Sequence, residues 1–410
     1  MRILFTSPNL PTPPTSGGAQ RSLLLLECLR RMGTVDCVYF PAQPPASSTV
    51  DAVCAGHDSF IHLVTTEDIS RASTPIWTKP LNERAASWFK AGRYRWLPHL
   101  PAIAHIGDLR RYDLVVSRYL SPACMLDLFR HPRVLIDVDD YDPDRLRQRL
   151  SHSSWFKRLT LRRCLRFSEQ AHHSFLPRAT HCWISNPEDR RHPGLGDATL
   201  LPNIPYFADG HGPASPPPPI NSKTLLMVGT LSYSANSDGL DAFLQQAWPA
   251  IIAREPDAKL HIVGKGLSSR QRDRWERIRG VHPIGFVESL DDPYRQALAC
   301  IAPIQAGGGT NIKVLEAAAY GRVCVVTAVA HRGFADTLPD QIACLRAETI
   351  AGMAGPCLRL LQNPQLAAGL GRAAADRVNI HHTRDVFNRA VLEGCERALA
   401  NRPAGEPTAP

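Results

Sequence analysis

The chain has 410 residues, of which 44% are hydrophobic and 21% are charged. These values are ordinary for globular proteins and exclude a disordered, collagen-like or coiled-coil chain, while the length suits two or three domains with separate hydrophobic cores. A formal net charge of +9 favours anionic partners, so nucleic acid, acidic lipid surfaces and nucleotide phosphates are all open at this stage.

Short β-like runs alternate with helical patterns along the chain, which is the sequence pattern of βαβ units and parallel sheets. This alternation predicts an α/β protein. The clearest expected strands are residues 2–6, 35–40, 114–117, 134–138, 224–228, 259–263, 299–303 and 323–327.

A proline-rich segment divides the chain in two. Four successive prolines within residues 208–221 favour a stiff, extended connector, and a new strand follows it. We predict two Rossmann-like, doubly wound domains that face a central cleft. The expected limits are 1–207 for the first domain, 208–221 for the linker, 222–378 for the second domain, and 379–410 for a terminal helix near residues 385–399 with a loose tail.

The cysteines and the apolar runs indicate a cytoplasmic protein. The eleven cysteines include no Cys-x-x-Cys pair and no zinc-finger spacing, and several lie in apolar runs, so we expect reduced core residues. The first apolar run reaches Pro8 too soon for a signal sequence, and no stretch has the ~18 uncharged apolar residues of a membrane span.

Basic and aromatic residues are interleaved in residues 79–109. Such a stretch either lies on an anionic membrane surface or forms a solvated helix whose aromatic residues enter the core. A second basic run, residues 157–166, allows the same two interpretations.

The strongest local signal is a glycine-rich turn after an expected strand and before an expected helix. Gly307, Gly308 and Gly309 have no Cβ to block their backbone amides, which together with a helix N-terminus make an anion site. Lys313 in the first helical turn suits a phosphate, and Glu316 on the same face suits a ribose diol. The alternative is a plain turn followed by a surface ion pair between Lys313 and Glu316.

A second glycine-containing turn, with Gly17 and Gly18, follows the first expected strand, so each domain carries one nucleotide-style turn. The acidic run after residue 136 is a further candidate. Asp137 and Asp139 form an Asp-x-Asp pair that either holds Mg²⁺ or Mn²⁺ or, together with Asp140, orients an acceptor hydroxyl or serves the structure. We favour the second interpretation.

In an ordered set of four elements the chain resembles the family-4 retaining glycosyltransferases of the GT-B fold. Residues 228–236 look like the opening strand and loop of that family's second domain, and residues 260–266 look like its strand end with Gly264 and Gly266. Residues 281–287 are similar to the turn that reads the nucleobase, and residues 303–321 look like the donor-binding signature.

The resemblance implies roles for individual residues. Lys313 would bind a donor phosphate and Glu316 the donor ribose, and Arg118 would support the leaving phosphate or the acceptor. The family holds the departing diphosphate without a divalent metal, so no metal and no cofactor besides the donor substrate is expected. The donor-binding set is Gly17, Gly18, Arg21, Phe286, Val287, Gly307, Gly308, Gly309, Thr310, Asn311, Lys313 and Glu316.

The chain also departs from the family pattern. Gly308 stands where the family often has the first of two glutamates, and Thr230 and Asn236 stand in the loop where many members have Arg and Lys. A subgroup associated with exopolysaccharide sugar transfer, which the chain resembles, shares the Asn and the glycine-rich replacement. The family usually has a histidine after the fourth strand of its first domain. In this chain no such histidine is evident, and Arg118 lies in that region.

The sequence therefore predicts a metal-independent transferase that moves a sugar from a nucleotide sugar to a hydroxyl acceptor with retention. The expected acceptor is a saccharide or lipid-linked molecule in cell-surface or extracellular polysaccharide synthesis, with peripheral contact to the inner face of the membrane and no nucleic-acid partner, because the positive charge is scattered. Two alternatives are a catalytically silent nucleotide-sugar-binding subunit and a sugar-nucleotide 2-epimerase.

Overall fold

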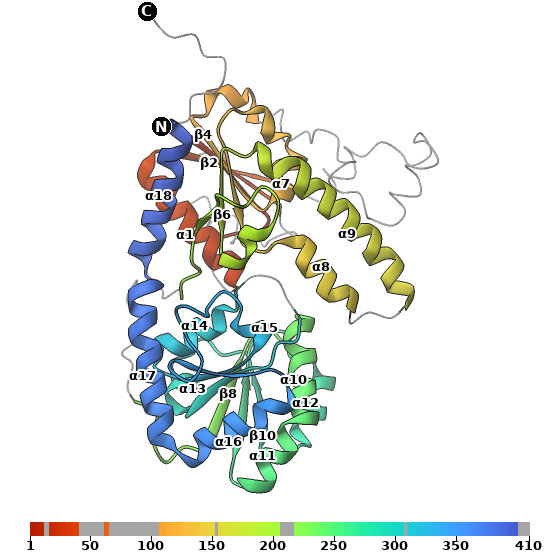
Figure 1. Ribbon diagram of the computed structural model, residues 1–410, viewed down its shortest axis with the longest axis vertical. Helices are drawn as coiled ribbons and strands as arrows, with labels where there is room; N and C mark the ends of the chain where they lie inside the picture. Colours follow the sequence, from red (N-terminus) through yellow and green to blue (C-terminus); the bar gives the residue numbers. More distant parts are fainter. Residues whose placement is uncertain are drawn as a thin grey trace, which may run out of the picture. The chain divides into compact units, whose positions relative to one another are not determined.

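The computed structural model describes residues 1–11, 16–40, 61–64, 106–151, 155–205, 217–306 and 310–400. These residues form two compact units, each built on its own parallel sheet (Figure 1). Unit 1 comprises Met1–Pro202 with Phe387–Pro410, and unit 2 comprises Asn203–Val386. Most of residues 79–109, the first basic and aromatic stretch, lies outside the described residues.

Unit 1 contains a parallel sheet with the order β3-β2-β1-β4-β5-β6-β7 among its described residues. The order reverses between β1 and β4, so the carboxyl ends of these two strands form a topological switch point, where α/β proteins bind ligands. The strands are β1 (Arg2–Ser7), β2 (Thr34–Tyr39), β3 (Ile61–Leu63), β4 (Leu114–Arg118), β5 (Val134–Val138), β6 (His181–Ile184) and β7 (Thr199–Leu200).

The helices of unit 1 connect these strands as parallel topology requires. The terminal helix packs on this unit, since the indole Nε1 of Trp183 donates to the carbonyl of Ala390 over 3.1 Å. The α-helices are α1 (Gly17–Met32), α7 (Leu120–Met125), α8 (Asp142–Ser151), α9 (Trp155–Phe175) and α18 (Arg384–Ala400), and the short 3₁₀ helices are η2 (Leu109–Arg111), η3 (Leu128–Arg130), η4 (Leu176–Arg178) and η5 (Pro187–Arg191).

Unit 2 contains a second parallel sheet, with the order β10-β9-β8-β11-β12-β13 and a switch point between β8 and β11. The strands are β8 (Thr224–Val228), β9 (Lys259–Val263), β10 (Val281–Gly285), β11 (Ala299–Ala302), β12 (Cys324–Thr327) and β13 (Cys344–Ala347). The helices are α10 (Ser234–Gln246), α11 (Trp248–Arg254), α12 (Ser269–Glu276), α13 (Asp291–Gln296), α14 (Ile312–Ala319), α15 (Ala328–His331), η6 (Ala351–Met353), α16 (Ala354–Gln362) and α17 (Pro364–His381).

The sheet of unit 2 has an apolar core on each face because successive side chains of a strand point to opposite sides. In β8, Leu225 and Met227 enter the core under α10, α11 and α16, whereas Leu226 enters the core under α13, α14 and α15. Helices are drawn on both sides of the sheet in Figure 1. Double coverage explains why the strands read as continuous apolar runs.

The predicted α/β, doubly wound architecture is confirmed by these two sheets. All eight expected strands are present, with ends that differ by at most one residue from the expected limits. The strands that were not expected are short, such as β6 and β13, or contain Pro and Gly, as β10 does.

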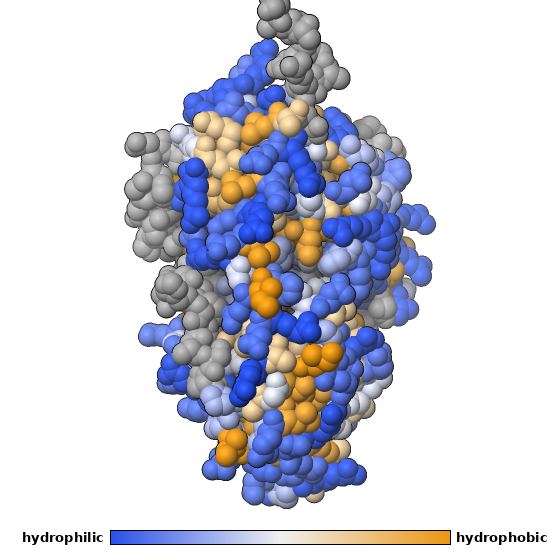
Figure 2. Space-filling model, turned by 60° about the vertical axis from the view of Figure 1, so that its left-hand side comes forward, coloured by the Kyte–Doolittle hydropathy of each residue, from blue (hydrophilic) through white to orange (hydrophobic). Residues whose placement is uncertain are grey.

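The surface and the cysteines are those of an ordinary globular protein. On the face shown in Figure 2, hydrophilic residues predominate and apolar residues form separate patches, which need no special explanation.

The ten described cysteines form no disulfide bond. Among the helices in the described ranges, none combines the length and the apolar character that spanning a membrane requires.

Candidate functional site

The loops after β8, β9 and β10 form a tightly packed edge in unit 2. The amide of Gly264 donates to the carbonyl of Gly285 over 2.8 Å, and the amide of Gly229 donates to the carbonyl of Val263 over 3.0 Å. Gly264 has φ +154°, and a Cβ there would lie 1.8 Å from the carbonyl oxygen of Gly229. Only glycine therefore fits where these chains meet.

Helix α10 approaches the end of β11 closely. A Cβ at Gly239 would lie 1.9 Å from the carbonyl oxygen of Pro303, so a larger residue would push the helix away from the strand end. This contact fixes the first turn of α10 beside the switch point. Asn236 on that turn is 5% exposed, and its Nδ2 donates to the carbonyl of Thr230 over 2.8 Å.

Lys313 projects from the first turn of α14 to the same place. Its ammonium donates to Oδ1 of Asn236, which is the only hydrogen bond of this ammonium within the described part of the chain. Burial lowers the pKa of Lys313 to about 8, and the nearby Cys324 and Glu316 offset the effect only in part. A partly buried cation with one neutral partner is a favourable place for an anion.

Hydrogen bonds with other segments of unit 2 fix the two residues that precede α14. Nδ2 of Asn203 donates to Oγ1 of Thr310 over 2.5 Å, and the carbonyl of Asn203 accepts from Nδ1 of His382 over 2.7 Å. Nδ2 of Asn311 donates to the carbonyl of Ala330 over 3.4 Å. These contacts leave the N-cap residue Asn311 without a side-chain bond to the helix amides.

Glu316 lies one turn further along α14, partly buried. Its charge acts on two stacked tyrosines, Tyr294 and Tyr320, whose ring centroids are 4.3 Å apart. Burial raises the pKa of both phenols and Glu316 raises it further, so both stay protonated. The hydroxyl of Tyr320 donates to a carboxylate oxygen of Asp291 over 2.7 Å, and this hydrogen bond joins the end of α14 to the start of α13.

An exposed aromatic residue follows β10. Phe286 is 59% exposed, and the ammonium of Lys265 lies 4.8 Å from the centre of its ring. Val287 is partly buried against the core on the α14 face. Phe286 thus offers a flat apolar surface at the carboxyl end of an edge strand. Gly307, Gly308 and Gly309 lie outside the described residues.

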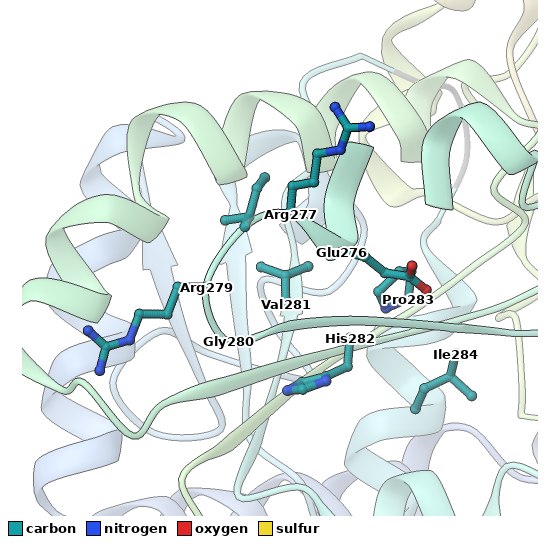
Figure 3. Close-up of a pocket in the computed structure, with 9 residues that line it drawn as sticks. Glu276, Arg277, Arg279, Gly280, Val281, His282, Pro283 and Ile284 are labelled. Carbon is teal, nitrogen blue, oxygen red and sulfur yellow. The ribbon is translucent and has the colours of Figure 1, made fainter. Parts of the chain in front are cut away.

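A surface pocket of about 470 Å³ lies elsewhere in unit 2. Residues 276–284 line it, between the end of α12 and the outer strand β10, and its loop precedes β10 instead of following it. In Figure 3, Arg277 and Arg279 point in different directions from its wall. Binding sites need convergent polar groups, so the loops at the carboxyl edge are the better candidate.

In unit 1 the predicted glycines begin α1. Ser16 caps this helix by accepting from the amide of Ala19 over 3.3 Å, and no acidic residue lies in the first turn. Gly18 packs against Asn9, whose Nδ2 would lie 2.8 Å from a Cβ at position 18. Its carbonyl accepts from Arg118 and from the hydroxyl of Ser22.

Arg118 ends β4 and is fully enclosed. Its side chain is 0% exposed, and Nε donates to Asp137 over 3.0 Å while one terminal nitrogen donates to Asp139 over 2.7 Å. The remaining donors reach the carbonyl of Gly18, the hydroxyl of Ser22 and the hydroxyl of Tyr119. All five guanidinium hydrogens therefore have acceptors in the protein.

Arg21 on α1 is 1% exposed and also binds Asp137, with a terminal nitrogen 2.6 Å from Oδ1. Burial opposes its charge, but Asp137 and Asp139 together raise the pKa of Arg21 above its ordinary value. Two arginines and two aspartates thus form a closed charge cluster, which we call the Arg–Asp cluster. The aspartates hold both guanidinium groups, and contact of Arg21 or Arg118 with a phosphate stays a prediction.

The Arg–Asp cluster also bears on the acidic run. Asp137 and Asp139 accept from arginines, which are competitors for the oxygens that a metal ion would need. Asp140 follows and is partly buried; burial and the charge of Asp139 raise its pKa to about 7. Tyr119, at φ 63°, lies beside this run and donates to Asp139 over 3.2 Å.

Sequence reasoning missed three members of these sites. Asn203 and His382 come from distant segments that show no motif, so nothing in the sequence could link them to α14. Asn236 was noticed only as a departure from the family pattern. Asn236 lies at the start of a helix that follows a glycine-containing turn. That position was a sequence signal that could have placed Asn236 beside Lys313.

Residues 222–363 match the family model described as Glycosyl transferases group 1, and this segment holds all the strands of unit 2. The chain is also 30% identical over 193 residues to a phosphatidyl-myo-inositol mannosyltransferase of Mycolicibacterium smegmatis. That alignment spans 45% of this chain and 48% of the relative, so the chain matches about half of the curated relative's length.

Solved structures share the fold along nearly the whole chain. The sucrose-phosphate synthase of Thermosynechococcus elongatus has a TM-score of 0.66 at 16% identity, covering 96% of this chain and 97% of that one. The Anabaena protein HepE in complex with UDP and glucose has a TM-score of 0.61 at 14% identity, covering 96% and 98%. The fold is therefore that of the GT-B glycosyltransferases.

Proposed function

We propose that this protein is a glycosyltransferase that moves a sugar from a nucleotide sugar to a hydroxyl acceptor and retains the anomeric configuration. The observation that carries the proposal is Lys313, a partly buried cation at the switch point of unit 2 whose hydrogen-bond partner is a neutral amide. A diphosphate would supply a negative charge at hydrogen-bonding distance from the ammonium, whereas the nearby Glu316 offsets the burial of Lys313 only in part.

The similar proteins indicate which nucleotide sugars should be tested first as donors. Structures of HepE contain UDP and UDP-glucose, and the mycobacterial relative is named as a mannosyltransferase. UDP-sugars and GDP-sugars are therefore the first candidates. The exposed ring of Phe286 would stack on the base, with Val287 beside it, and Glu316 would accept from the ribose hydroxyls.

We further propose that transfer needs no metal. Lys313, the amides of the glycine-rich turn and the N-terminus of α14 would hold the developing charge on the diphosphate. The leaving phosphate oxygen would take the proton of the acceptor hydroxyl as the new glycosidic bond forms on the same face, so no covalent enzyme intermediate is required. Because both are buried, we propose that Arg118 and Arg21 position the first turn of α1, where the carbonyl of Gly18 accepts from Arg118.

The acceptor is proposed to be a saccharide or a lipid-linked hydroxyl, in cell-surface or extracellular polysaccharide synthesis on the cytoplasmic side of a membrane. The mycobacterial relative, whose name contains a phospholipid, supports a lipid-linked acceptor. Nucleic acid is not proposed as a partner.

Calorimetry of the full chain with UDP-, GDP-, dTDP- and ADP-sugars, each with and without EDTA, tests the donor site. We expect one nucleotide sugar to bind, with the same affinity in EDTA. Binding that needs a divalent ion would overturn metal independence, and binding of none would overturn the donor site. Proton NMR of the product of the binding donor then reports the anomeric configuration.

Glu316→Ala tests the ribose contact. The variant should lose roughly 1–3 kcal/mol of donor affinity, because the two diol hydroxyls lose a charged acceptor. Glu393→Ala, an exposed carboxylate on α18 of unit 1, is the control and should leave the affinity unchanged. Equal affinity of wild type and Glu316→Ala would remove Glu316 from the site.

A second candidate is a nucleotide-sugar-binding subunit without transfer activity. The enclosure of Arg118 favours it, because the position expected to support the reaction from the first domain is closed. Binding of a donor without turnover on any acceptor would favour this candidate, whereas a changed sugar without acceptor would indicate a 2-epimerase.

A further inference from the structure

We propose that Asn203 orients the hydroxyl of Thr310 so that its proton is donated to the diphosphate of the nucleotide sugar. Thr310 would then contact the donor directly, and Asn203 would be a positioning residue that acts through it. Both roles rest on the donor site proposed above. They add to that site a residue that lies 107 positions before Thr310 in the chain.

The hydrogen bond between Asn203 and Thr310 has one direction. Nδ2 of Asn203 donates to Oγ1 of Thr310 over 2.5 Å, and an amide nitrogen cannot accept. The hydroxyl oxygen is therefore the acceptor in this contact, and its single proton points to another group. Within the described residues, the structure gives this proton no acceptor. A hydroxyl that already accepts one hydrogen bond donates a stronger one, because the two bonds polarise each other.

A buried histidine holds the backbone of Asn203. The carbonyl of Asn203 accepts from Nδ1 of His382 over 2.7 Å, and Nε2 of His382 lies 3.2 Å from the hydroxyl oxygen of Thr337. Burial lowers the pKa of His382 to about 4, so the ring is neutral and carries its one proton on Nδ1. Thr337 then donates to Nε2. Asn203 is itself buried, so packing as well as hydrogen bonding restricts its side chain.

The surroundings of Thr310 favour an anionic acceptor for its proton. Thr310 is partly buried and directly precedes Asn311, the N-cap residue of α14, whose side chain makes no hydrogen bond to the helix amides. The first turn of this helix contains Lys313 and no acidic residue. The helix dipole and the ammonium attract negative charge, and a hydroxyl that donates to a phosphate oxygen makes a charge-assisted hydrogen bond. A phosphate of the donor therefore fits this position better than a neutral hydroxyl of the sugar.

Reversal of the hydrogen bond tests the orientation. Asn203→Asp places an acceptor where the amide donated, so the proton of Thr310 should turn to the carboxylate and away from the diphosphate. The probe is whichever of UDP, GDP, dTDP and ADP the wild-type chain binds in calorimetry. Its affinity should fall about tenfold or more, the value of a charge-assisted hydrogen bond. Thr310→Val, which removes the hydroxyl and keeps the shape, should lose a similar amount. Wild-type affinity in either variant would overturn the proposal.

The two variants combined separate orientation from charge. If Asn203→Asp acts through the hydroxyl, it should cause no further loss in the Thr310→Val background. Additive losses would mean that the carboxylate only repels the ligand, and the positioning role would fail. Thr310→Ser keeps the hydroxyl and should retain both the wild-type affinity and the sensitivity to Asn203→Asp. The controls Asn221→Asp, in an exposed turn of unit 2, and Thr160→Val, on α9 of unit 1, should leave the affinity unchanged.

The matching nucleoside, which has no phosphate, distinguishes this contact from a general disturbance of the site. Thr310→Val and Asn203→Asp should bind it as the wild type does, because the lost hydrogen bond is to phosphate. Equal losses for nucleoside and diphosphate would show a disturbed α14 and overturn the contact. If the wild type binds a diphosphate and the variants bind it equally well, the donor site stands without these roles; if the wild type binds none of the four, both fall. Unchanged circular dichroism establishes that the variants are folded.

Discussion

The carboxyl edges of the two sheets treat positive charge in opposite ways. In unit 1, Arg21 and Arg118 are enclosed and share Asp137 and Asp139, so the fold itself neutralises them. In unit 2, Lys313 is held by the neutral side chain of Asn236, and burial lowers its pKa to about 8. A cation that the fold pairs with carboxylates holds the structure together, whereas one that it leaves without a charged hydrogen-bond partner is available to a ligand.

The largest effect should follow from breaking the compensated side of this comparison. Arg118→Met leaves Asp137 and Asp139 buried with one arginine fewer, which should cost unit 1 about 3–5 kcal/mol. Hydrogen exchange of the β4 and β5 amides measures the loss within unit 1, without assuming that both units unfold together.

A surface ion pair provides the control for Arg118. Arg110 and Asp108 are bonded over 2.9 Å but are 87% and 56% exposed, so Arg110→Met should leave exchange in β4 unchanged. If Arg118→Met protected β4 as well as the wild type does, the Arg–Asp cluster would not be a structural device, and the contrast between the units would fail.

The pairing of Arg118 with Asp137 also shows where sequence reasoning ends. Both residues lie on strands that were predicted from continuous apolar runs, but they meet because the register of β4 and β5 places them side by side, and Arg21 arrives from a helix more than a hundred residues away. Register and helix position come from packing of the whole unit. Local pattern cannot supply them.

The site in unit 2 was more accessible to sequence reasoning because its parts are local. A glycine-rich turn, a strand before it and a helix after it place Lys313 and Glu316 on one helix face by periodicity alone. The hydrogen bond to Asn236 joins segments 77 residues apart and could not be seen. β10 was missed as a strand because Pro283 and Gly285 interrupt its short pattern.

The next effect concerns the uncompensated side. Lys313→Met should weaken nucleotide-sugar binding by about 10- to 100-fold, the value of a charge-assisted hydrogen bond, in calorimetry. It should not destabilise unit 2, because a cation without a charged partner at hydrogen-bonding distance costs free energy when it is buried.

Lys259→Met is the control for Lys313, since Lys259 is exposed at the start of β9. Its donor affinity should equal that of the wild type. Loss of stability in Lys313→Met of the size seen in Arg118→Met would mean that both cations are structural, and the difference between the two edges would disappear.

The pH dependence gives a smaller effect whose sign separates the two functions of Lys313. Its pKa is about 8 in the folded chain against an ordinary 10.5. Between these values the unfolded chain holds a proton that the folded chain has released, so the stability of unit 2 rises with pH over this window. Donor affinity does the reverse and should fall above pH 8, by up to about tenfold per unit, because the ammonium is lost.

Calorimetry at pH 7 and pH 9.5 and hydrogen exchange in unit 2 measure the two trends. Both should vanish in Lys313→Met. An affinity that is constant over this range in the wild type would mean that the cation does not contact the donor.

The smallest effect comes from making unit 2 resemble unit 1. Asn236→Asp places a carboxylate against Lys313, which should raise the pKa of the lysine and make the charge pair internal, as in the Arg–Asp cluster. The gain in stability should be only about 1 kcal/mol, because the substitution also removes the Nδ2 that donates to the carbonyl of Thr230. Donor affinity should nevertheless fall, since the carboxylate repels a diphosphate and competes for the ammonium.

Calorimetry measures the donor affinity of Asn236→Asp and urea unfolding measures its stability, with Asn221→Asp as an exposed control. A variant that binds the donor as well as the wild type would show that compensation of a charge by the fold does not prevent its use by a ligand.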